Sequence, residues 1–94
     1  MPSTEPVAFG RYTLLRPLGE GGMAEVYLAE TTGPGQFRKR VAIKRLLPHH
    51  AANRRFVAMM RDEAQIAAAI QHPNVAEVLD FGEVEGQHYI AMEF

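Results

Sequence analysis

The chain has 94 residues, of which 47% are hydrophobic and 22% are charged, and its formal net charge is -1. These values indicate one small globular unit, and they give no sign of the strongly basic surface that nucleic acids or anionic membranes attract. The sequence holds no cysteine, which excludes disulfides and thiolate metal sites. Because it also lacks a membrane-spanning apolar run and a secretory signal pattern, we expect a cytoplasmic segment without a membrane segment.

Extended segments dominate the predicted secondary structure, and one helix interrupts them. Residues 1–10 carry two prolines and small polar residues, and we expect a flexible lead-in there. Residues 11–94 form the predicted domain, with a helix at about 53–70 that His72, Pro73 and Asn74 end. Its strands are predicted at about residues 12–20, 24–31, 37–46, 75–81 and 88–94, with a turn at 82–87 before the last. The expected fold class is therefore α+β, a five-stranded antiparallel sheet with one long helix packed on it.

A glycine-rich turn joins the first two predicted strands. It lies in the stretch LGEGGMAEVYLA, where Gly19, Gly21 and Gly22 fall within four residues. Glycine lets a backbone approach a ligand closely, so a hairpin tip of this kind could fold over a phosphate chain. The pattern also fits an ordinary hairpin turn, and Ala24 stands where the third glycine of a G-x-G-x-x-G motif would be. The loop alone leaves both interpretations open.

Lys44 lies at the end of the third predicted strand. Side chains alternate along a strand, so Ala42 and Lys44 share one face while Val41 and Ile43 share the other. The small Ala42 leaves room for a flat group, and Lys44 brings a positive charge to the same space. The alternative is a lysine that extends its ammonium group into water, as lysines usually do.

Glu63 lies within the apolar pattern of the predicted helix. The residues Phe56, Met59, Met60, Ile66, Ala67 and Ile70 follow the spacing of one helical face, and Glu63 falls among them. A carboxylate that faces a core needs a cation or a solvated cleft, because an unpaired buried charge costs several kcal/mol, on the order of its desolvation penalty. Lys44 is the candidate partner. The alternative is a narrower stripe that leaves Glu63 in water.

Two other charged features predict no site. The basic run Arg38, Lys39 and Arg40 is typical of a solvated strand edge that resists pairing with other chains. The histidines are scattered, and the adjacent His49 and His50 do not share a strand or helix face, so we predict no metal site.

The order of these motifs resembles the amino-terminal lobe of a protein kinase. The motifs are the glycine-rich hairpin, VAIK at residues 41–44, the helical Glu63, HPNV at residues 72–75 and YIAMEF at residues 89–94. The stretch GEGGMAEVYLAE is similar to the glycine-rich segment of bacterial eukaryotic-like, or Hanks-type, serine/threonine kinases. The resemblance covers about residues 10 to 94, nearly the whole chain.

The resemblance implies a role for each motif. Lys44 would pair with the α- and β-phosphates of ATP, and Glu63 would hold Lys44 in place; these two are the expected catalytic residues of this segment. Leu18, Val26 and Ala42 would line the adenine pocket. The full expected ATP-binding set is Leu18, Gly19, Glu20, Gly21, Gly22, Met23, Ala24, Val26, Ala42, Lys44, Met92 and Glu93.

The end of the chain corresponds to the kinase hinge in this resemblance. Met92 sits at the gatekeeper position, and Glu93 would offer its backbone carbonyl to the adenine amino group. The catalytic aspartate, the ligands of Mg²⁺ and the protein-substrate site of such kinases belong to a second lobe, which lies outside residues 11–94. We therefore expect a lobe truncated at the hinge that is inactive alone. Its apolar underside, with Val26, Ala42 and Met92, is expected to favour self-association.

Two other classes of protein were weighed. A non-catalytic interaction module could keep the lobe fold and bind a partner through its helix. A Rossmann-type dinucleotide domain is rejected, because its glycines must precede a helix, whereas Glu25 to Ala29 continues as strand. The reading frame beyond Phe94 separates the first possibility from a kinase segment.

Overall fold

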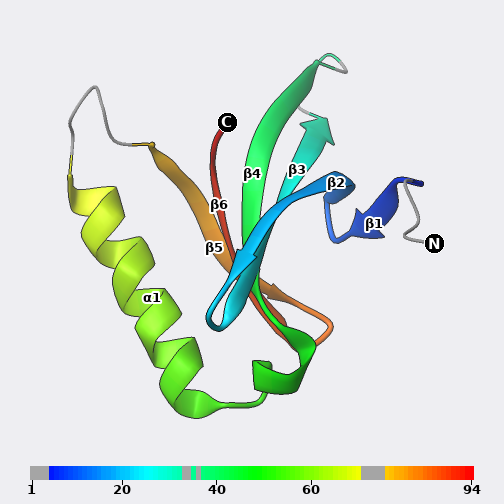
Figure 1. The fold of residues 1–94 in the computed structure, drawn as a ribbon. Helices are drawn as coiled ribbons and strands as arrows, with labels where there is room; N and C mark the ends of the chain where they lie inside the picture. The colour runs from blue at the N-terminus through cyan, green and yellow to red at the C-terminus, as the bar shows by residue number, and fades with distance from the viewer. Residues whose placement is uncertain (1–4, 33–34, 36, 71–75) are drawn as a thin grey trace.

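The computed structural model describes residues 5–32, 35, 37–70 and 76–94, and these form a strongly curled antiparallel sheet with one long helix on one side (Figure 1). The strand order in the sheet is β1-β2-β3-β4-β6-β5. The elements are β1 (Val7–Phe9), β2 (Tyr12–Gly21), β3 (Ala24–Thr32), β4 (Arg38–Leu46), η2 (Pro48–His50), α1 (Arg54–Ala69), β5 (Val78–Val84) and β6 (Gln87–Glu93). The α+β class and the single long helix are as predicted.

The sheet has six strands rather than the predicted five. The additional strand is β1, within the segment expected to be a flexible lead-in. Its register pairs Val7 with Leu14 and Phe9 with Tyr12. Phe9 is buried, and its ring packs edge-on against Tyr89 with ring centroids 5.4 Å apart. The short strand is therefore held by an aromatic contact with a residue far along the chain, which local composition does not reveal.

The last hairpin is tighter than predicted. The sequence predicted a turn at 82–87, but β5 continues to Val84 and β6 starts at Gln87. The two linking residues, Glu85 and Gly86, both have positive φ, at 49° and 83°. That combination is typical of a two-residue type I′ turn. The predicted helix stop at residues 72–74 and the start of the predicted strand at Val75 lie outside the described residues.

The helix begins and ends close to the predicted positions. The side chain of Asn53 caps it by accepting hydrogen bonds from the backbone N–H groups of Arg55 and Phe56, at 3.0 and 3.3 Å. Its apolar stripe was predicted too wide, however. Met60 and Ala64 are its buried residues. Met59, Ile66 and Ile70 are instead 49%, 63% and 49% exposed.

The curl of the sheet divides its apolar residues into two clusters. On the concave face, α1 packs over Ala24, Leu46 and Ile90. On the outer face, β1 and β2 fold over a second buried cluster: Phe9, Tyr12, Leu14, Ala29, Val41, Ile43, Tyr89 and Ala91. Both faces of β4 therefore contribute to a buried cluster, although its first residues, Arg38 to Arg40, pair with β3 but not with β6.

A polar cluster joins the two ends of the sheet. One oxygen of Asp80 in β5, Oδ2, accepts hydrogen bonds from Tyr89 at 2.7 Å, from Tyr12 at 3.1 Å and from Arg11 Nη2 at 2.8 Å. A Cβ added at Gly10, in the β1–β2 turn, would lie only 2.9 Å from Val84 at the end of β5. These contacts hold the sheet in its curled shape.

Candidate functional site

The predicted pocket residues Val26, Ala42, Lys44 and Met92 share the concave face of the sheet. The register pairs Val26 with Lys44 across β3 and β4, and Ala42 with Met92 across β4 and β6. Residues directly opposite each other in an antiparallel pair point to the same face. Ala42 and Val41 therefore point to opposite faces, which confirms the alternation predicted from the sequence.

Lys44 and Glu63 form the predicted ion pair. Lys44 Nζ donates a hydrogen bond to Glu63 Oε1 at 2.8 Å, and the two side chains are 26% and 47% exposed. The pair bridges the sheet and α1, and it stands at the rim of the concave face rather than in the core. The wide apolar stripe had implied a buried Glu63, and the structure shows that Glu63 is half exposed. It nevertheless contacts Lys44, its predicted partner.

The space around the three glycines of the glycine-rich turn is open, and no other described part of the fold fills it. Gly19 pairs with Val26, and Gly21 pairs with Ala24. A Cβ added at Gly19, Gly21 or Gly22 would meet no other atom of the described residues within 4 Å. Only Gly22 has a positive φ, 57°, as the first of the two residues that link the strands. Neither packing nor backbone geometry therefore requires glycine at position 19 or 21.

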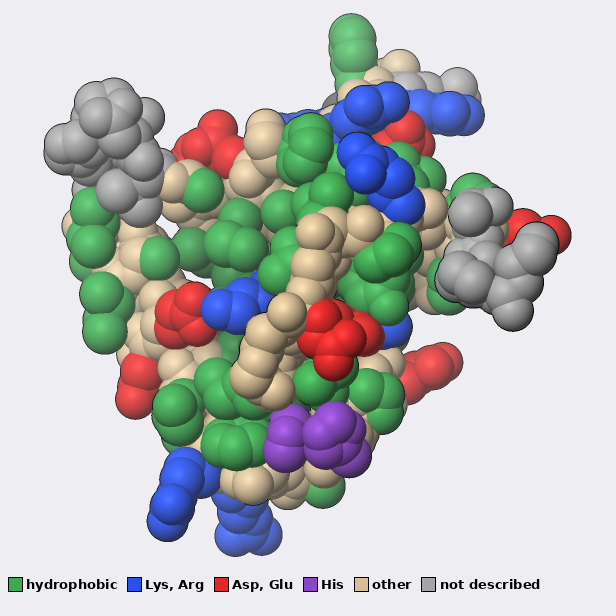
Figure 2. All heavy atoms as spheres, in the orientation of Figure 1, with side chains coloured by type: hydrophobic (Ala, Val, Ile, Leu, Met, Phe, Trp, Pro, Cys, Tyr) green, Lys and Arg blue, Asp and Glu red, His purple; other side chains and the backbone are tan. Residues whose placement is uncertain are grey.

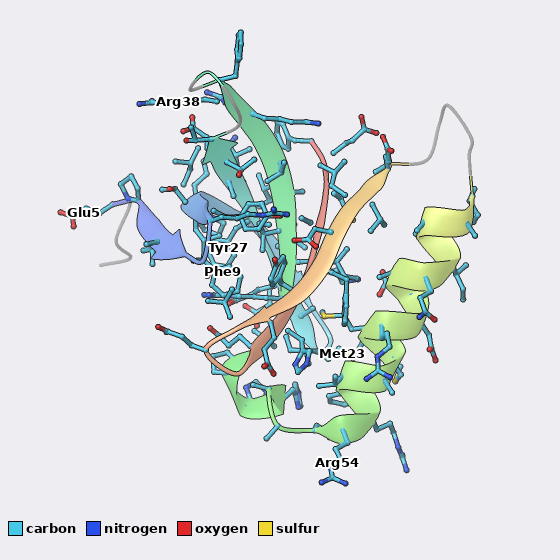
Figure 3. All side chains as sticks on the ribbon, turned by 180° about the vertical axis from the view of Figure 1, so that it is seen from behind. Glu5, Phe9, Met23, Tyr27, Arg38 and Arg54 are labelled. Atoms are coloured by element: carbon cyan, nitrogen blue, oxygen red, sulfur yellow. The ribbon has the colours of Figure 1, made fainter. Side chains whose placement is uncertain are left out.

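The tip of the hairpin is tied to the body of the lobe. The backbone carbonyl of Met23 accepts a hydrogen bond from the N–H of Leu47 at 2.9 Å. Ala24 is 3% exposed within the concave-face cluster, and Met23 packs against that cluster (Figure 3). The side chain of Ala24 thus serves packing, and the residue as a whole is covered. A larger residue there would disturb the core, which explains a small residue in place of the third glycine.

Leu18 and Glu93 occupy special backbone positions. The β2–β3 register shifts between Pro17 and Gly19, so Leu18 is the extra residue of a bulge, and it is 41% exposed. Bulges of this kind re-aim side chains beside binding sites.

The Glu93 carboxylate accepts a hydrogen bond from the N–H of Glu77 at 3.1 Å, and the N–H of Glu93 donates to the Glu77 carbonyl at 2.9 Å. The side chain of Glu93 is therefore engaged in fixing the strand end.

Glu20 lies outside the concave site in the register. It faces Glu25, and neighbouring rungs alternate between the two faces, so its side chain points away from that of Val26. Any contact of Glu20 with a ligand would be through its backbone.

The sequence analysis did not single out Arg45, whose side chain lies on this outer face. An arginine inside an apolar strand was a signal of a buried ion pair.

A groove runs along the exposed side of α1 next to the ion pair. Its volume is about 520 Å³, and its lining residues are Met23, Met59, Asp62, Glu63, Ile66, Ala67 and Ile70. Figure 2 shows hydrophobic side chains along α1 on this side of the molecule.

The described part of the chain contains no group of three His, Asp or Glu residues placed to hold a metal ion. Its helices include none with the length and apolar character needed to span a membrane.

The concave face, the glycine turn and the lysine–glutamate pair together define the amino-terminal lobe of a protein kinase. Residues 12–94 match the family described as protein tyrosine and serine/threonine kinase, and the chain belongs to that family. The fold agrees: the PknI kinase domain of Mycobacterium tuberculosis, solved in the form of a double mutant, is similar with a TM-score of 0.71 and 40% identity, covering all of this chain and 37% of that chain.

Curated relatives are kinases of bacteria. The chain is 47% identical over 94 residues to the tyrosine-protein kinase MasK of Myxococcus xanthus, covering 100% of the chain. It is 44% identical over 85 residues to the serine/threonine-protein kinase PrkC of Bacillus subtilis, covering 90% of the chain. The chain spans only 14% and 13% of the lengths of these two relatives.

Proposed function

We propose that this chain is the ATP-binding lobe of a protein kinase that transfers the γ-phosphate of ATP to serine or threonine side chains of proteins. The observation that supports it most is the Lys44–Glu63 ion pair at 2.8 Å, placed one strand away from a glycine turn with open space above it. An ammonium group fixed by a carboxylate is suited to neutralise phosphate charge.

The concave face offers an apolar place for the adenine base of ATP. Val26, Ala42 and Met92 supply an apolar surface beside Lys44, and the exposed Leu18 is the bulge residue of β2 next to Gly19. The glycines at 19 and 21 leave the backbone open to the phosphate oxygens. Mg²⁺, which bridges the phosphates in such reactions, would be held by residues of a second lobe.

Relatives named for serine/threonine and for tyrosine specificity both match this lobe. The hydroxyl-bearing substrate binds the second lobe in kinases, so the choice of serine and threonine rests on the GEGGMAEVYLAE resemblance. We further propose that the kinase uses ATP and Mg²⁺, acts on protein and works in the cytoplasm.

The test is phosphoryl transfer from γ-labelled ATP, measured with the full-length protein and with residues 1–94 alone. We expect label on serine or threonine of a protein substrate with the full-length protein and none with residues 1–94. Label transferred by residues 1–94 would contradict the proposal that phosphoryl transfer requires residues of a second lobe. A full-length protein without transfer, and without affinity for ATP, would favour the non-catalytic module.

A further inference from the structure

Arg45 follows Lys44 on β4 and points to the opposite, outer face of the sheet. Its Nε donates a hydrogen bond to Glu25 Oε1 at 2.7 Å, and the side chains of this ion pair are only 17% and 16% exposed. Arg45 and Glu25 also face each other in the β3–β4 register. The pair is therefore more enclosed than the Lys44–Glu63 pair on the other face.

Two aromatic rings enclose the guanidinium group of Arg45. Its Cζ lies 4.9 Å from the ring centroid of Tyr27 and 5.2 Å from that of Phe9. Figure 3 shows Phe9 and Tyr27 close together, near β1. A planar guanidinium group stacks on rings and bonds a carboxylate at the same time, which a lysine cannot match. Phe9 comes from β1, a strand that lies outside the family match at residues 12–94.

Glu25 stands at the base of the glycine turn. It follows Ala24, the first residue of β3, and precedes Val26, which faces Lys44. The ion pair therefore fixes the rung of the β3–β4 ladder next to the rung that holds Lys44. A shift of Glu25 along β4 would change the distance between the glycine turn and the Lys44 ammonium group.

We propose that Arg45 is a positioning residue for ATP: through Glu25 it holds the glycine hairpin at the correct height over Lys44. Phe9 of β1 completes the site by excluding water from the ion pair, which makes β1 a working part of the nucleotide lobe. This inference rests on the proposed function, because it assumes that ATP lies between the glycine turn and Lys44.

The experiment is steady-state kinetics of the full-length protein with ATP as the varied substrate. The variants are Arg45→Met, Glu25→Gln and their combination. Each single change should raise the KM for ATP about five- to tenfold, as expected for a coupling of neighbouring charges. The value of kcat should stay within about twofold, because Lys44 and the second lobe are unchanged. The double variant should match the singles.

Three further variants separate positioning from mere support of the fold. Arg45→Lys keeps the charge but loses the planar stacking, so its KM should lie between those of the wild type and Arg45→Met. Phe9→Leu keeps apolar volume and should also raise the KM. Arg40→Met is the matched control: Arg40 faces Glu30 on the same two strands, is exposed, and has no ion pair with Glu30 among the described residues. It should leave both constants unchanged.

An unchanged KM in Arg45→Met and Glu25→Gln would overturn the proposal. So would a loss of kcat in proportion to a lowered melting temperature, with no change in KM, since that would show a purely structural role. Lys44→Met, measured in parallel, tells the two failures apart. If Lys44→Met is inactive while Arg45→Met has wild-type kinetics, only the role of Arg45 is wrong; if Lys44→Met is fully active, the ATP site itself is wrong.

Discussion

Gly19 lies directly opposite Val26 in the β2–β3 ladder, so the first glycine of the turn stands over the apolar side of the candidate ATP site. Its backbone is not in the left-handed region, and a Cβ there would meet nothing within 4 Å. The fold therefore tolerates a side chain at this position, whereas a nucleotide bound as proposed would not.

Gly19→Ala and Gly21→Ala should separate stability from binding. The free energy of unfolding should stay the same or rise by up to about 1 kcal/mol, because alanine restricts the unfolded chain. Affinity of the full-length protein for ATP should fall. Gly22→Ala is the matched control, since its φ of 57° penalises a side chain by about 1 kcal/mol or more. Denaturant unfolding and nucleotide titration check this. Equal destabilisation by all three changes, without loss of affinity, would contradict it.

Strand alternation and helix periodicity were sufficient to predict much of this site. The faces of Ala42 and Lys44 follow from the two-residue period of β4, and the partnership of Lys44 with Glu63 follows from charge inside an apolar pattern. The limits of the helical stripe did not follow, because the small Ala64 lets α1 approach the sheet on one narrow side. That geometry leaves Ile66 exposed although its spacing fits the stripe.

The contacts that cover the outer face could not be predicted from the sequence, although Arg45 itself stands out as an arginine inside an apolar strand. Strand β1 is fixed by Phe9 against Tyr89 and Arg45, and those contacts join parts of the chain far apart in sequence. A three-residue strand has no periodicity of its own to detect. The polar cluster at Asp80 likewise exists only once the two ends of the sheet meet.

The Asp80 cluster should make stability depend on pH at both extremes. Burial alone would raise the pKa of Asp80, but hydrogen bonds from Tyr89 and Tyr12 and the charge of Arg11 outweigh it, so the pKa of Asp80 is lowered. Its contribution to stability is therefore present above the ordinary carboxyl range and lost as pH falls through its folded pKa. Burial and the bond to Asp80 raise the pKa of Tyr89, whose contribution is lost as pH rises above about 10.

Tyr89→Phe tests this cluster. At pH 7 it should cost about 1.5–3 kcal/mol of unfolding free energy, as for a hydrogen bond to a charged group. The cost should shrink as the pH falls below the ordinary carboxyl range and Asp80 takes up a proton, because its pKa is lowered. Tyr27→Phe is the control, because the hydroxyl group of Tyr27 has no hydrogen bond among the described residues. Urea unfolding followed by circular dichroism, from pH 7 down through the acid range, gives the cost at each pH, and a cost that stays constant over the whole range would refute the assignment.

The exposed apolar side of α1 should drive association of residues 1–94. Met59, Ile66 and Ile70 line the groove beside Glu63, and large exposed apolar patches favour contact with other protein surfaces. We expect light scattering to show self-association at micromolar concentration, reduced by Ile66→Lys. Phe37→Ser is the control, since Phe37 is 77% exposed but lies before β4, away from this groove. A clean monomer, or an equal effect of Phe37→Ser, would argue against a role for this face.

The central claim is that Lys44 serves the phosphates of ATP and that Glu63 acts by holding Lys44. The decisive measurement is the phosphoryl-transfer rate of the full-length protein with Lys44→Met, Glu63→Gln and both changes together. Lys44→Met should abolish transfer with the fold intact, Glu63→Gln should reduce it less, and the double variant should resemble Lys44→Met alone. Were both residues independent surface charges, each change would leave the rate nearly unaltered and shift stability by at most about half a kcal/mol. Near-wild-type transfer by Lys44→Met would contradict the account.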